Sequence, residues 1–257
     1  MTSTEAASLV AVVTGGATGI GRAACERLAD EGVGTIIINY SRSAEAAERL
    51  AGSLSTAGVK AHAVQADISD LASVEAMFER IGGEFGRVDY LVNNAGTTEL
   101  IPFRDLDAVT PAVWERLLGT NLLGSFWCSR AAAPLLKETR GAIVNVASIA
   151  GMRGVGSSLP YGVTKAGVLQ LTRSLAIALA PDVRVNSVSA GTVRSGWHEK
   201  LVGEDVFAER SEHESTVVPL KRLAVPEDIA EGVVSLLRMS FVTGQDLLID
   251  GGQGLLY

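Results

Sequence analysis

Short, continuously apolar runs alternate with helical stretches along most of the chain, and this alternation constrains the fold more than any other feature. Runs such as LVAVV, TIIIN and AIVNV do not alternate with polar residues, which is typical of strands buried on both faces of a sheet. Predicted strands cover residues 9–13, 35–39, 59–65, 88–92, 142–146, 183–188 and 245–249. Predicted helices cover residues 20–30, 43–56, 69–81, 111–136, 158–180 and 226–239, with Ser69 capping the third of them.

Strands and helices in regular alternation fold as a parallel sheet with right-handed crossovers and with helices on both faces. We therefore expect an α/β fold, a doubly wound parallel sheet in a three-layer α/β/α sandwich. No stretch resembles an interdomain linker, so we expect a single domain over residues 1–257. Residues 194–224 interrupt the pattern with a charged, irregular segment that carries Trp197 and Phe207. Because this segment follows the sixth strand, we expect it to be a substrate-loop lid.

The composition excludes several classes of function. With 47% hydrophobic residues the chain can bury a substantial core, and its net charge of -7 argues against a nucleic-acid surface. The start, MTSTEAASLVAVVTGG, lacks the basic region of a signal peptide, and no apolar run is long enough to span a membrane. Cys25 and Cys128 lie far apart, so we expect buried free thiols in a cytoplasmic protein. We expect no metal site, because His62, His198 and His213 form no cluster with other donors.

The motif TGGATGIG, residues 14–21, joins the first predicted strand to the first predicted helix. Gly15 permits a tight turn, Gly19 lets the backbone approach a pyrophosphate, and Gly21 allows close packing of helix on strand. The helix N-terminus supplies free N–H groups and the positive end of the helix dipole for the phosphates. A glycine-rich turn can also be no more than a turn, but this strand-turn-helix context predicts dinucleotide binding.

The residues after the second strand decide which dinucleotide fits. An NAD site usually places an acidic residue there to accept a hydrogen bond from the ribose 2′-OH. The run Asn39-Tyr40-Ser41-Arg42-Ser43 holds no carboxylate. A hydroxyl and a guanidinium suit a 2′-phosphate better, which favours NADP(H) and leaves NAD(H) as the alternative. The competing interpretation of Arg42 is an ordinary solvated charge near a helix start.

Tyr161 and Lys165 stand four residues apart in the stretch SLPYGVTK. We expect Ser157 or Ser158 as the helix N-cap and Pro160 in the first turn, which puts the phenol and the ammonium on one helix face. A neighbouring ammonium favours the phenolate, so we expect the Tyr161 pKa to fall from about 10 toward working pH. Such a pair is also common on solvated helix faces, and alone it is weak evidence for catalysis.

Other polar residues follow the carboxyl ends of neighbouring strands. Ser148 closes the fifth strand, thirteen residues before Tyr161. Asn121 falls inside a predicted helix, an unfavourable place for asparagine unless its side chain has a partner. Asp67 follows the third strand, where it either accepts from an adenine amine or caps the next helix. The NNAG motif, residues 93–96, follows the fourth strand, and its small residues let the backbone lie against a flat cofactor.

These motifs, in this order and at this spacing, resemble the short-chain dehydrogenase/reductase family, nearest to its 3-oxoacyl-carrier-protein-reductase-like branch. The motifs are TGGATGIG, Asp67, NNAG, Asn121, Ser148 and YGVTK, and the resemblance covers about residues 9–252. It implies a Rossmann-like domain with seven parallel strands that interconverts a ketone and a secondary alcohol by hydride transfer. It also implies a homotetramer or homodimer built on the helices that carry Asn121 and Tyr161.

The resemblance further implies a catalytic tetrad. Tyr161 would be the general acid that protonates the developing alkoxide, while Lys165 would lower the Tyr161 pKa and hold the nicotinamide ribose. Ser148 would hydrogen-bond the substrate oxygen, and Asn121 would hold a water that connects Lys165 to solvent. The implied cofactor-binding residues are Gly15, Thr18, Gly19, Ile20, Gly21, Tyr40, Ser41, Arg42, Asp67, Ile68, Asn94, Ala95, Gly96, Tyr161, Lys165, Val193 and Ser195.

The sequence leaves the substrate open. The pocket for a small carbonyl or alcohol would be shaped by residues 97–104, 149–159 and 194–224, where Met152, Trp197 and Phe207 indicate either a partly apolar pocket or ordinary packing. An acyl chain, a sterol, a sugar and a quinone all remain candidates. One alternative function is an NAD-dependent dehydrogenase of a sugar or steroid alcohol. Another is a non-catalytic dinucleotide-sensing protein, which the presence of all four tetrad residues disfavours.

Overall fold

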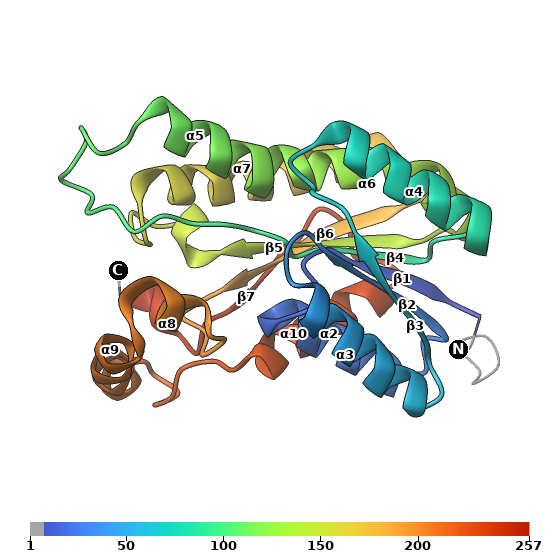
Figure 1. Cartoon of the computed structure of the whole chain (residues 1–257). Coiled ribbons are helices and arrows are strands. Elements are labelled where there is room, and N and C mark those ends of the chain that lie inside the picture. The colour runs from blue at the N-terminus through green and yellow to red at the C-terminus, as the bar shows by residue number, and fades with distance from the viewer. Residues whose placement is uncertain (1–7, 257) are drawn as a thin grey trace.

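Seven parallel strands form one sheet in the computed structural model, which describes residues 8–256 apart from the side chains of residues 198 and 200. The strand order is β3-β2-β1-β4-β5-β6-β7 (Figure 1). The strands are β1 (Val10–Val13), β2 (Thr35–Tyr40), β3 (Lys60–Gln65), β4 (Tyr90–Asn93), β5 (Ala142–Ser148), β6 (Arg184–Ala190) and β7 (Asp246–Ile249). The predicted seven-stranded parallel α/β sheet is confirmed.

Helices cover both faces of the sheet and complete three layers (Figure 1). One face carries α2 (Gly19–Asp30), α3 (Ala44–Thr56) and α10 (Pro226–Arg238). The other face carries α4 (Leu71–Phe85), α6 (Gly124–Thr139) and α7 (Leu159–Leu179), with α5 (Pro111–Leu117) beside α7. The shorter 3-10 turns are η2 (Ile149–Gly151) and η3 (Gln253–Leu255).

The strands are apolar on both sides because each face of the sheet has its own core. In β1, the side chains of Ala11 and Val13 belong to the core that contains Leu28 of α2, whereas Val12 belongs to the core that contains Phe78 of α4. All three β1 side chains are fully buried. The continuously apolar runs of the sequence therefore reflect burial from two directions.

The order of the strands reverses between β1 and β4. The chain runs outward from β1 through β2 to β3 and then returns to β4 on the other side of β1, where Val13 pairs with Ile38 on one side and with Val92 on the other. The crossovers diverge at this point and leave a crevice beyond the carboxyl ends of the two strands. The glycine-rich turn follows β1 and the NNAG loop follows β4, so both motifs lie at this crevice.

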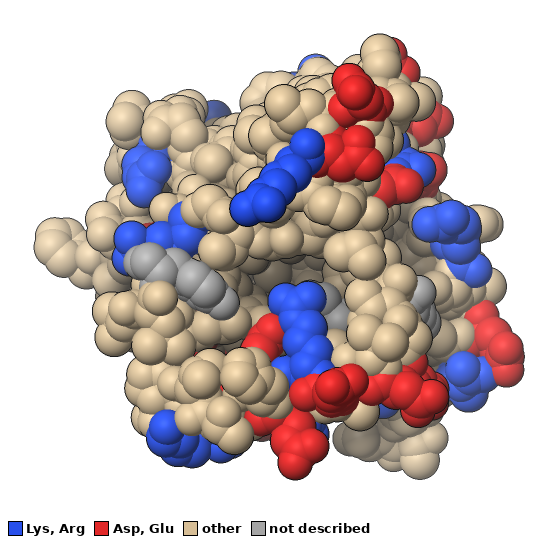
Figure 2. Space-filling model, turned by 90° about the vertical axis from the view of Figure 1, so that its left-hand side faces the viewer, with Lys and Arg blue, Asp and Glu red and all other residues tan. Residues whose placement is uncertain are grey.

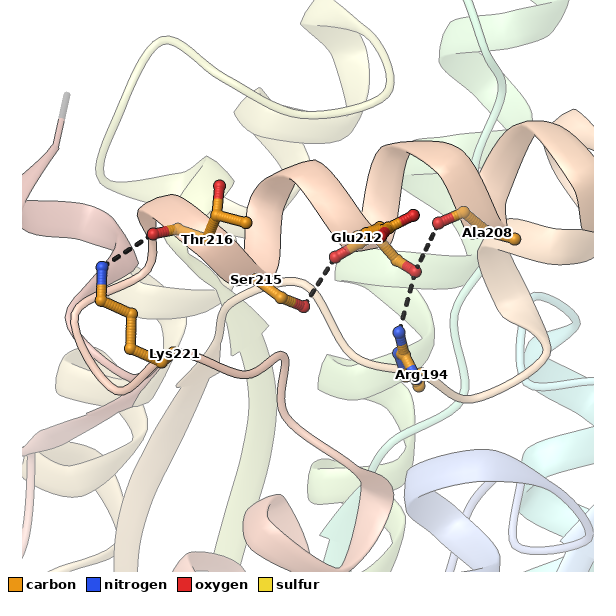
Figure 3. A pocket seen from close by; sticks show the side chains of 7 residues that line it. Arg194, Ala208, Glu212, Ser215, Thr216 and Lys221 are labelled. Atoms are coloured by element: carbon orange, nitrogen blue, oxygen red, sulfur yellow. Dashed lines mark hydrogen bonds between the residues drawn. The ribbon is translucent and has the colours of Figure 1, made fainter.

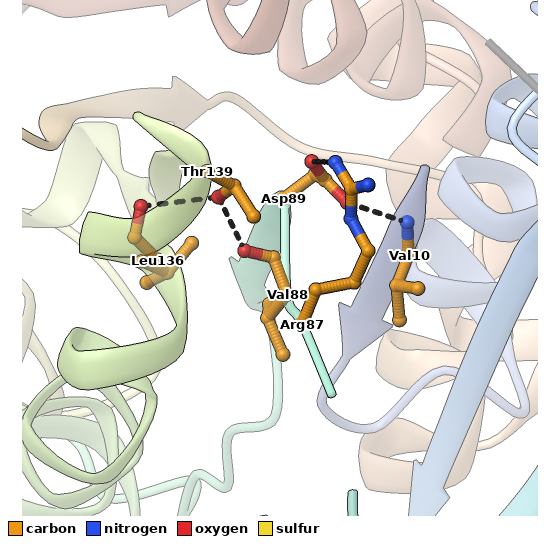
Figure 4. A network of polar contacts seen from close by, with 6 residues as sticks. All are labelled: Val10, Arg87, Val88, Asp89, Leu136 and Thr139. Atoms are coloured by element: carbon orange, nitrogen blue, oxygen red, sulfur yellow. Dashed lines mark hydrogen bonds and ion pairs between the residues drawn. The ribbon is translucent and has the colours of Figure 1, made fainter. Parts of the chain in front are cut away.

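A polar network ties the opposite, amino ends of β1 and β4 together (Figure 4). The buried Asp89 carboxylate accepts from the Val10 N–H (2.8 Å) and from Nε and Nη2 of Arg87 (2.9 and 2.6 Å). Thr139 of α6 donates its hydroxyl to the Val88 carbonyl (2.7 Å). These bonds fix the alignment of β1 with β4 at the end of the sheet remote from the crevice.

The predicted continuous helix over residues 111–136 is wrong in its middle. After α5 the backbone passes through one π-helical segment, η1 (Leu118–Leu123), before α6 begins at Gly124. π-Helical turns frequently mark functional sites, because the extra residue re-aims nearby side chains. Asn121 lies in η1 and is buried.

The third predicted helix also differs from the structure at both ends. Asp70, not Ser69, is the N-cap of α4, since its Oδ1 accepts from the Ala72 N–H (3.1 Å). The helix continues beyond residue 81 through two glycines to Phe85, and its C-cap is Gly86, whose φ of 70° is the left-handed conformation that glycine adopts without strain. The other predicted boundaries agree with the structure to about two residues.

The segment over residues 194–224 is mostly helical, which contradicts its prediction as irregular. It contains α8 (Trp197–Val202) and α9 (Glu204–Val217), which share a small apolar cluster of Phe207, Val218 and Leu223 with Val202 at its edge. Few apolar residues recur in α9, so the sequence lacks the periodicity that predicts a helix. Acidic residues in its first turn, Glu204 and Asp205, favour the helix through its dipole instead.

Two expectations concern parts of the chain outside the described residues. The predicted absence of a signal peptide involves residues 1–7, and the predicted absence of a histidine metal cluster involves the His198 side chain. Across residues 8–256, no helix is long and apolar enough to cross a membrane. In the same described part, no group of three or more His, Cys, Asp or Glu side chains is placed to hold a metal ion. Cys25 and Cys128 are buried free thiols, as predicted.

Candidate active site

Tyr161 lies in the first turn of α7, and the sequence before it explains why the helix begins there. Ser158 is the N-cap, and its Oγ accepts from the Tyr161 N–H (3.4 Å). Pro160 occupies the first turn, where a missing N–H costs no intrahelical bond. Of the two predicted caps, Ser158 is therefore the correct one. The helix then presents Tyr161 and Lys165 one turn apart, as predicted.

Ser148 ends β5 and faces Tyr161 across the η2 turn. A hydrogen bond joins the Ser148 side chain to the Tyr161 phenol. Ser148 Oγ also accepts from the Ala150 N–H (3.2 Å), which fixes its rotamer at the strand end. Gly156 lies close by, since a Cβ placed there would be 3.5 Å from Tyr161 Cδ1. The loop between β5 and α7 thus brings the two hydroxyls together.

Lys165 is buried beneath Tyr161. Lys165 is only 6% exposed, and its Nζ donates to the Val146 carbonyl of β5 (2.8 Å). Nζ lies 5.8 Å from the centre of the Tyr161 ring. Burial lowers the pKa of Lys165 from its ordinary 10.5 to about 8. An ammonium has three N–H donors, so the bond to Val146 leaves two for other acceptors.

The predicted fall of the Tyr161 pKa is wrong for the protein on its own. Burial of the phenol raises its pKa, and the hydrogen bond from Ser148 offsets only part of that effect. Desolvation disfavours the charged phenolate, while the Lys165 ammonium is directed toward the Val146 carbonyl. The sequence places the two groups one turn apart but contains no measure of how deeply they are buried.

Asn121 has the partners that its position in a helix requires. Its Oδ1 accepts from the Thr97 N–H (2.7 Å), and its Nδ2 donates to the Thr97 carbonyl (2.9 Å) and to Thr164 Oγ1 (3.0 Å). Thr164 precedes Lys165 in α7 and donates to the Tyr161 carbonyl (2.8 Å). Asn121 therefore links the loop after β4 to the turn of α7 that carries both Tyr161 and Lys165.

Gly96 makes the approach of these elements possible. A Cβ at residue 96 would lie 3.3 Å from Asn121 Oδ1 and 3.9 Å from Lys165 Nζ. The NNAG loop, the π-helical segment and α7 consequently meet at one point. Asn121, Ser148, Tyr161 and Lys165 come from three separate segments, η1, the end of β5 and α7, that converge at the carboxyl end of the sheet.

A buried polar network that sequence reasoning missed lies between these segments. Asn93 of β4 donates from Nδ2 to Asn145 Oδ1 of β5 (2.8 Å) and to Ser129 Oγ of α6 (2.9 Å). Asn145 Nδ2 donates in turn to Thr172 Oγ1 of α7 (2.9 Å). The network joins two strands to the two helices above them. Polar residues inside the otherwise apolar runs YLVN and AIVNVAS are the signal that would have revealed it.

The glycine-rich turn is held against the NNAG loop. Asn94 Nδ2 donates to the carbonyls of Thr14 (3.0 Å) and Gly15 (3.1 Å), and Thr14 Oγ1 accepts from the N–H groups of Asn94 (3.0 Å) and Ala95 (3.1 Å). A Cβ at Gly21 would lie only 2.3 Å from the Gly15 carbonyl oxygen. Any side chain larger than hydrogen would separate α2 from the turn, so this cradle requires glycine.

The N-terminus of α2 fits a phosphate group. Thr18 is the N-cap but makes no side-chain cap bond, and the first turn holds no acidic residue, so its N–H groups are left for another acceptor. Gly19 has a φ of 53°, and a Cβ there would lie 3.5 Å from Ser195 Cβ. Ile20 packs against the core that contains Leu28. The buried Val193 forms a β-bridge with Ala224, which fixes the 193–195 loop.

A cavity of about 720 Å³ begins at Thr18, Gly19 and Ser195 and continues between α2, α3 and the start of α10, where charged side chains such as Glu26 and Arg49 also line it. Figure 2 looks onto the side of the molecule that carries α8 and α9 and shows a hollow bordered by basic and acidic side chains. The free N–H groups and the small residues at the start of α2 together suit the pyrophosphate of a dinucleotide.

The residues after β2 lie at the outer end of the crevice. Tyr40 ends the strand, and the Ser41 carbonyl accepts from Gln65 Nε2 (3.0 Å). Ser41 and Arg42 are exposed, with their side chains turned to solvent. Asn39, which sequence reasoning did not single out, supports this end because its Oδ1 accepts from the N–H of the turn's first glycine (3.4 Å).

Asp67 does not cap the next helix. Its Oδ1 accepts from the N–H (2.9 Å) and the hydroxyl (2.7 Å) of Ser69, which shapes the loop between β3 and α4. The neighbouring Ile68 is buried against Gly124 of α6. Of the two roles considered for Asp67, the structure removes the helix cap, and the exposed carboxylate stays at the crevice.

Comparison with known proteins agrees with this arrangement. A family profile described as enoyl-(acyl carrier protein) reductase matches residues 15–253. A relative from Streptomyces violaceoruber, named for a ketoacyl reductase of the granaticin polyketide synthase, is 43% identical over 248 residues that cover 96% of each chain. The 3-oxoacyl-[acyl-carrier-protein] reductase of Staphylococcus aureus is 37% identical over 248 residues, covering 94% of this chain and 96% of the relative.

A solved structure extends the agreement to three dimensions. A protein from Burkholderia xenovorans described as a short-chain dehydrogenase/reductase superposes with a TM-score of 0.88 at 33% sequence identity, over 97% of this chain and 98% of the other. The match covers both the sheet and the converging segments described above. The chain belongs to the short-chain dehydrogenase/reductase family and is related to its 3-oxoacyl-acyl-carrier-protein reductases.

Proposed function

We propose that this protein reduces a ketone to a secondary alcohol, and catalyses the reverse reaction, with NADP(H) as the hydride carrier and Tyr161 as general acid and base. The family is one of oxidoreductases, and a nicotinamide dinucleotide is its hydride source. The single observation that carries the proposal is the convergence of Asn121, Ser148, Tyr161 and Lys165 beside the glycine-rich turn.

The contact between Ser148 and Tyr161 supports their roles. Two hydroxyls joined by a hydrogen bond can both point at one carbonyl oxygen, with Ser148 fixing its position and Tyr161 donating the proton. A bound nicotinamide supplies the hydride for the carbonyl carbon. Tyr161 holds its proton at neutral pH because burial raises its pKa, so it is ready to act as the acid in ketone reduction.

Lys165 supports Tyr161 in its role as proton donor. With a pKa of about 8 it is mostly an ammonium at neutral pH, and its two remaining N–H donors are available to a phenolate and to ribose hydroxyls. A nearby ammonium stabilises the phenolate that remains after proton transfer. Asn121 fixes the α7 turn through Thr164 and is a positioning residue in this proposal.

The NADP(H) preference rests on the residues after β2. Ser41 and Arg42 are exposed at the outer end of the crevice, and residues 39–43 contain no carboxylate to pair with a ribose 2′-OH. A guanidinium pairs well with a 2′-phosphate. We expect NADPH to bind more tightly than NADH, by about tenfold or more, in a fluorescence titration.

A charge reversal at residue 42 tests that preference. Arg42→Asp removes the cation and supplies an acceptor for a free 2′-OH, so it should weaken NADPH binding and spare or improve NADH binding. Arg80→Asp is the matched control, because Arg80 is an exposed arginine of α4 that pairs with Glu84 away from the crevice. Equal affinity of the wild type for NADPH and NADH would contradict the proposal.

We further propose a 3-oxoacyl thioester or a related polyketide-like ketone as the substrate class, supported by the names of the relatives. Two loops border the catalytic residues, and the Ile101 N–H donates to the Ser157 carbonyl (2.9 Å) to join them. A hydrogen bond between Thr98 and Ser157 adds to this junction. Phe103 and Met152 on these loops are 40% and 42% exposed and offer apolar surface to the substrate. Residues 194–224 act as the lid.

A homotetramer or homodimer is the proposed assembly. Apolar side chains stand exposed on η1 and α7, the elements that carry Asn121 and Tyr161: Leu123 at 43%, Val163 at 48% and Ile177 at 81%. Burying them between subunits would remove apolar surface from water. Light scattering on the purified protein measures the subunit number. We also propose a cytoplasmic location, supported by the two free, buried thiols.

The experiment that tests the function is a screen of NADPH consumption over 3-oxoacyl thioesters, cyclic ketones, sugars and quinones, followed by identification of the product. Reduction of a ketone to its secondary alcohol is the expected result. NADPH binding without turnover of any carbonyl would contradict the enzymatic proposal and favour a dinucleotide-sensing protein. Turnover with NADH alone would favour the NAD-dependent dehydrogenase.

A further inference from the structure

Arg194 is the first residue of the lid, at the end that lies beside the glycine-rich turn. Its N–H donates to the Ala224 carbonyl (2.9 Å), beside the bridge between residues 193 and 224. The next residue, Ser195, lies against Gly19 at the start of α2. The backbone of Arg194 is therefore fixed between the lid and the end of α2 that we assign to the pyrophosphate.

The Arg194 side chain borders two cavities. One is the cavity of about 720 Å³ that Thr18, Gly19 and Ser195 also line. The other, of about 750 Å³, lies against one face of α9 and is lined by Arg194, Ala208, Ser211, Glu212, Ser215, Thr216 and Lys221. Figure 3 shows Arg194 directed from its loop toward α9, while Lys221 reaches the far end of that helix.

The guanidinium of Arg194 is only partly used. Its Nη2 donates to Ser211 Oγ of α9 (3.0 Å), and Ser211 in turn donates to the Ala208 carbonyl (3.0 Å). Among the residues that the structure describes, Arg194 forms no ion pair, although ten other arginines do. A guanidinium has five N–H donors in a planar fork, so four remain for other acceptors.

The hydrogen bond between Arg194 and Ser211 joins α9 to the loop after β6. The apolar cluster of α8 and α9 is separate from the two main cores. Ser211 is 2% exposed and lies on the face of α9 that is turned to the cavity, where polar side chains replace an apolar stripe. Gly196 and Gly203, with φ of 76° and 88°, flank α8 and let the backbone turn there.

We propose that Arg194 couples dinucleotide binding to the position of the lid, by pairing with a cofactor phosphate while its Nη2 stays on Ser211. A phosphate at the α2 N-terminus would engage the free arm of the guanidinium, and the bridge from phosphate to Ser211 would fasten α9 over the site. The inference rests on the proposed dinucleotide site and adds to it a residue outside the motifs that identified that site. In this proposal Arg194 is both a phosphate ligand and the link to α9.

The test combines NADPH titration with hydrogen–deuterium exchange of residues 204–217. In the wild type, saturating NADPH should slow amide exchange in α9. Arg194→Met should weaken NADPH binding by about tenfold and abolish the added protection of α9 even at saturation. Ser211→Ala should keep NADPH affinity within about threefold but also lose the added protection, because only the link to the lid is cut.

Two further variants separate this role from general damage. Arg194→Lys keeps a positive charge without the fork, so it should retain part of the affinity and little of the protection. Arg210→Met removes an exposed arginine of α9 that pairs with Glu214 and should change neither quantity. Wild-type affinity or wild-type α9 protection in Arg194→Met would overturn the inference while leaving the proposed function intact. Failure of the wild type to bind NADPH or NADH would overturn both.

Discussion

Replacing Gly21 with alanine tests whether the contact between α2 and the glycine-rich turn has the tightness that dinucleotide binding requires. The added Cβ would lie 2.3 Å from the Gly15 carbonyl oxygen and 2.5 Å from Asn94 Nδ2. Ordinary contact begins near 3.4 Å, so the overlap with the Gly15 carbonyl is about 1 Å. Because that oxygen belongs to the backbone, it cannot rotate away, and α2 or the turn must move.

The expected cost follows from this overlap. Forcing one methyl into a well-packed contact destabilises a protein by about 1–3 kcal/mol, and the better helix propensity of alanine returns up to about 1 kcal/mol. We expect a net loss of about 1–2 kcal/mol in the free energy of unfolding, measured by urea denaturation. Displacement of the turn should also weaken NADPH binding by about tenfold or more in a fluorescence titration.

Gly83→Ala is the matched control. Gly83 lies inside α4, and a Cβ there would meet no atom within 4 Å. The substitution should stabilise the protein by about 0.5–1 kcal/mol and leave NADPH affinity unchanged. If Gly21→Ala behaved like Gly83→Ala in both measurements, the account of the cradle would be refuted.

Three other predictions follow from the buried polar contacts. Asn121→Ala removes both bonds to the loop after β4 and the bond to α7, so denaturation should show a loss of about 2–3 kcal/mol and turnover should fall more than substrate affinity. Asp89→Asn keeps one oxygen for the Val10 N–H but turns an N–H donor toward Arg87, so it should cost about 2 kcal/mol, against less than about 0.5 kcal/mol for the surface control Glu75→Gln. Lys165 has a pKa of about 8 in the folded chain and near 10.5 unfolded, so the unfolded chain binds more protons between these values. Its contribution to the free energy of unfolding must therefore rise from about pH 8 to pH 10.5, and a Lys165→Met variant that showed the same rise as the wild type would contradict the assignment.

Most of the fold could be predicted because the sequence pattern and the packing agree. Continuously apolar strands are the expected consequence of two covered faces, and the glycines of residues 14–21 mark the turn at which the strand order reverses. The π-helical segment around Asn121 could not be predicted, since Gly119, Thr120 and Asn121 weaken a helix without specifying a π-helical hydrogen-bond pattern. The helix α9 could not be predicted for another reason, because it buries little apolar surface and has no apolar stripe.

The candidate site could be assembled in part because the carboxyl ends of parallel strands meet at one edge. That rule places Ser148 and the NNAG loop beside the glycine-rich turn without coordinates. The rule contains no information about burial, so the predicted direction of the Tyr161 pKa shift was wrong. The links through Thr164 and Asn145 depend on side-chain directions across elements far apart in sequence, so they require the structure.

The most direct test of the central claim compares Tyr161→Phe with Tyr90→Phe on a ketone that the wild type reduces with NADPH. Both changes remove one hydroxyl from a phenol ring, but Tyr90 begins β4 at the end of the sheet remote from the crevice. If Tyr161 donates the proton, single-turnover NADPH oxidation should fall by about a thousandfold in Tyr161→Phe and stay near the wild-type rate in Tyr90→Phe. NADPH oxidation by Tyr161→Phe at the wild-type rate would contradict the account.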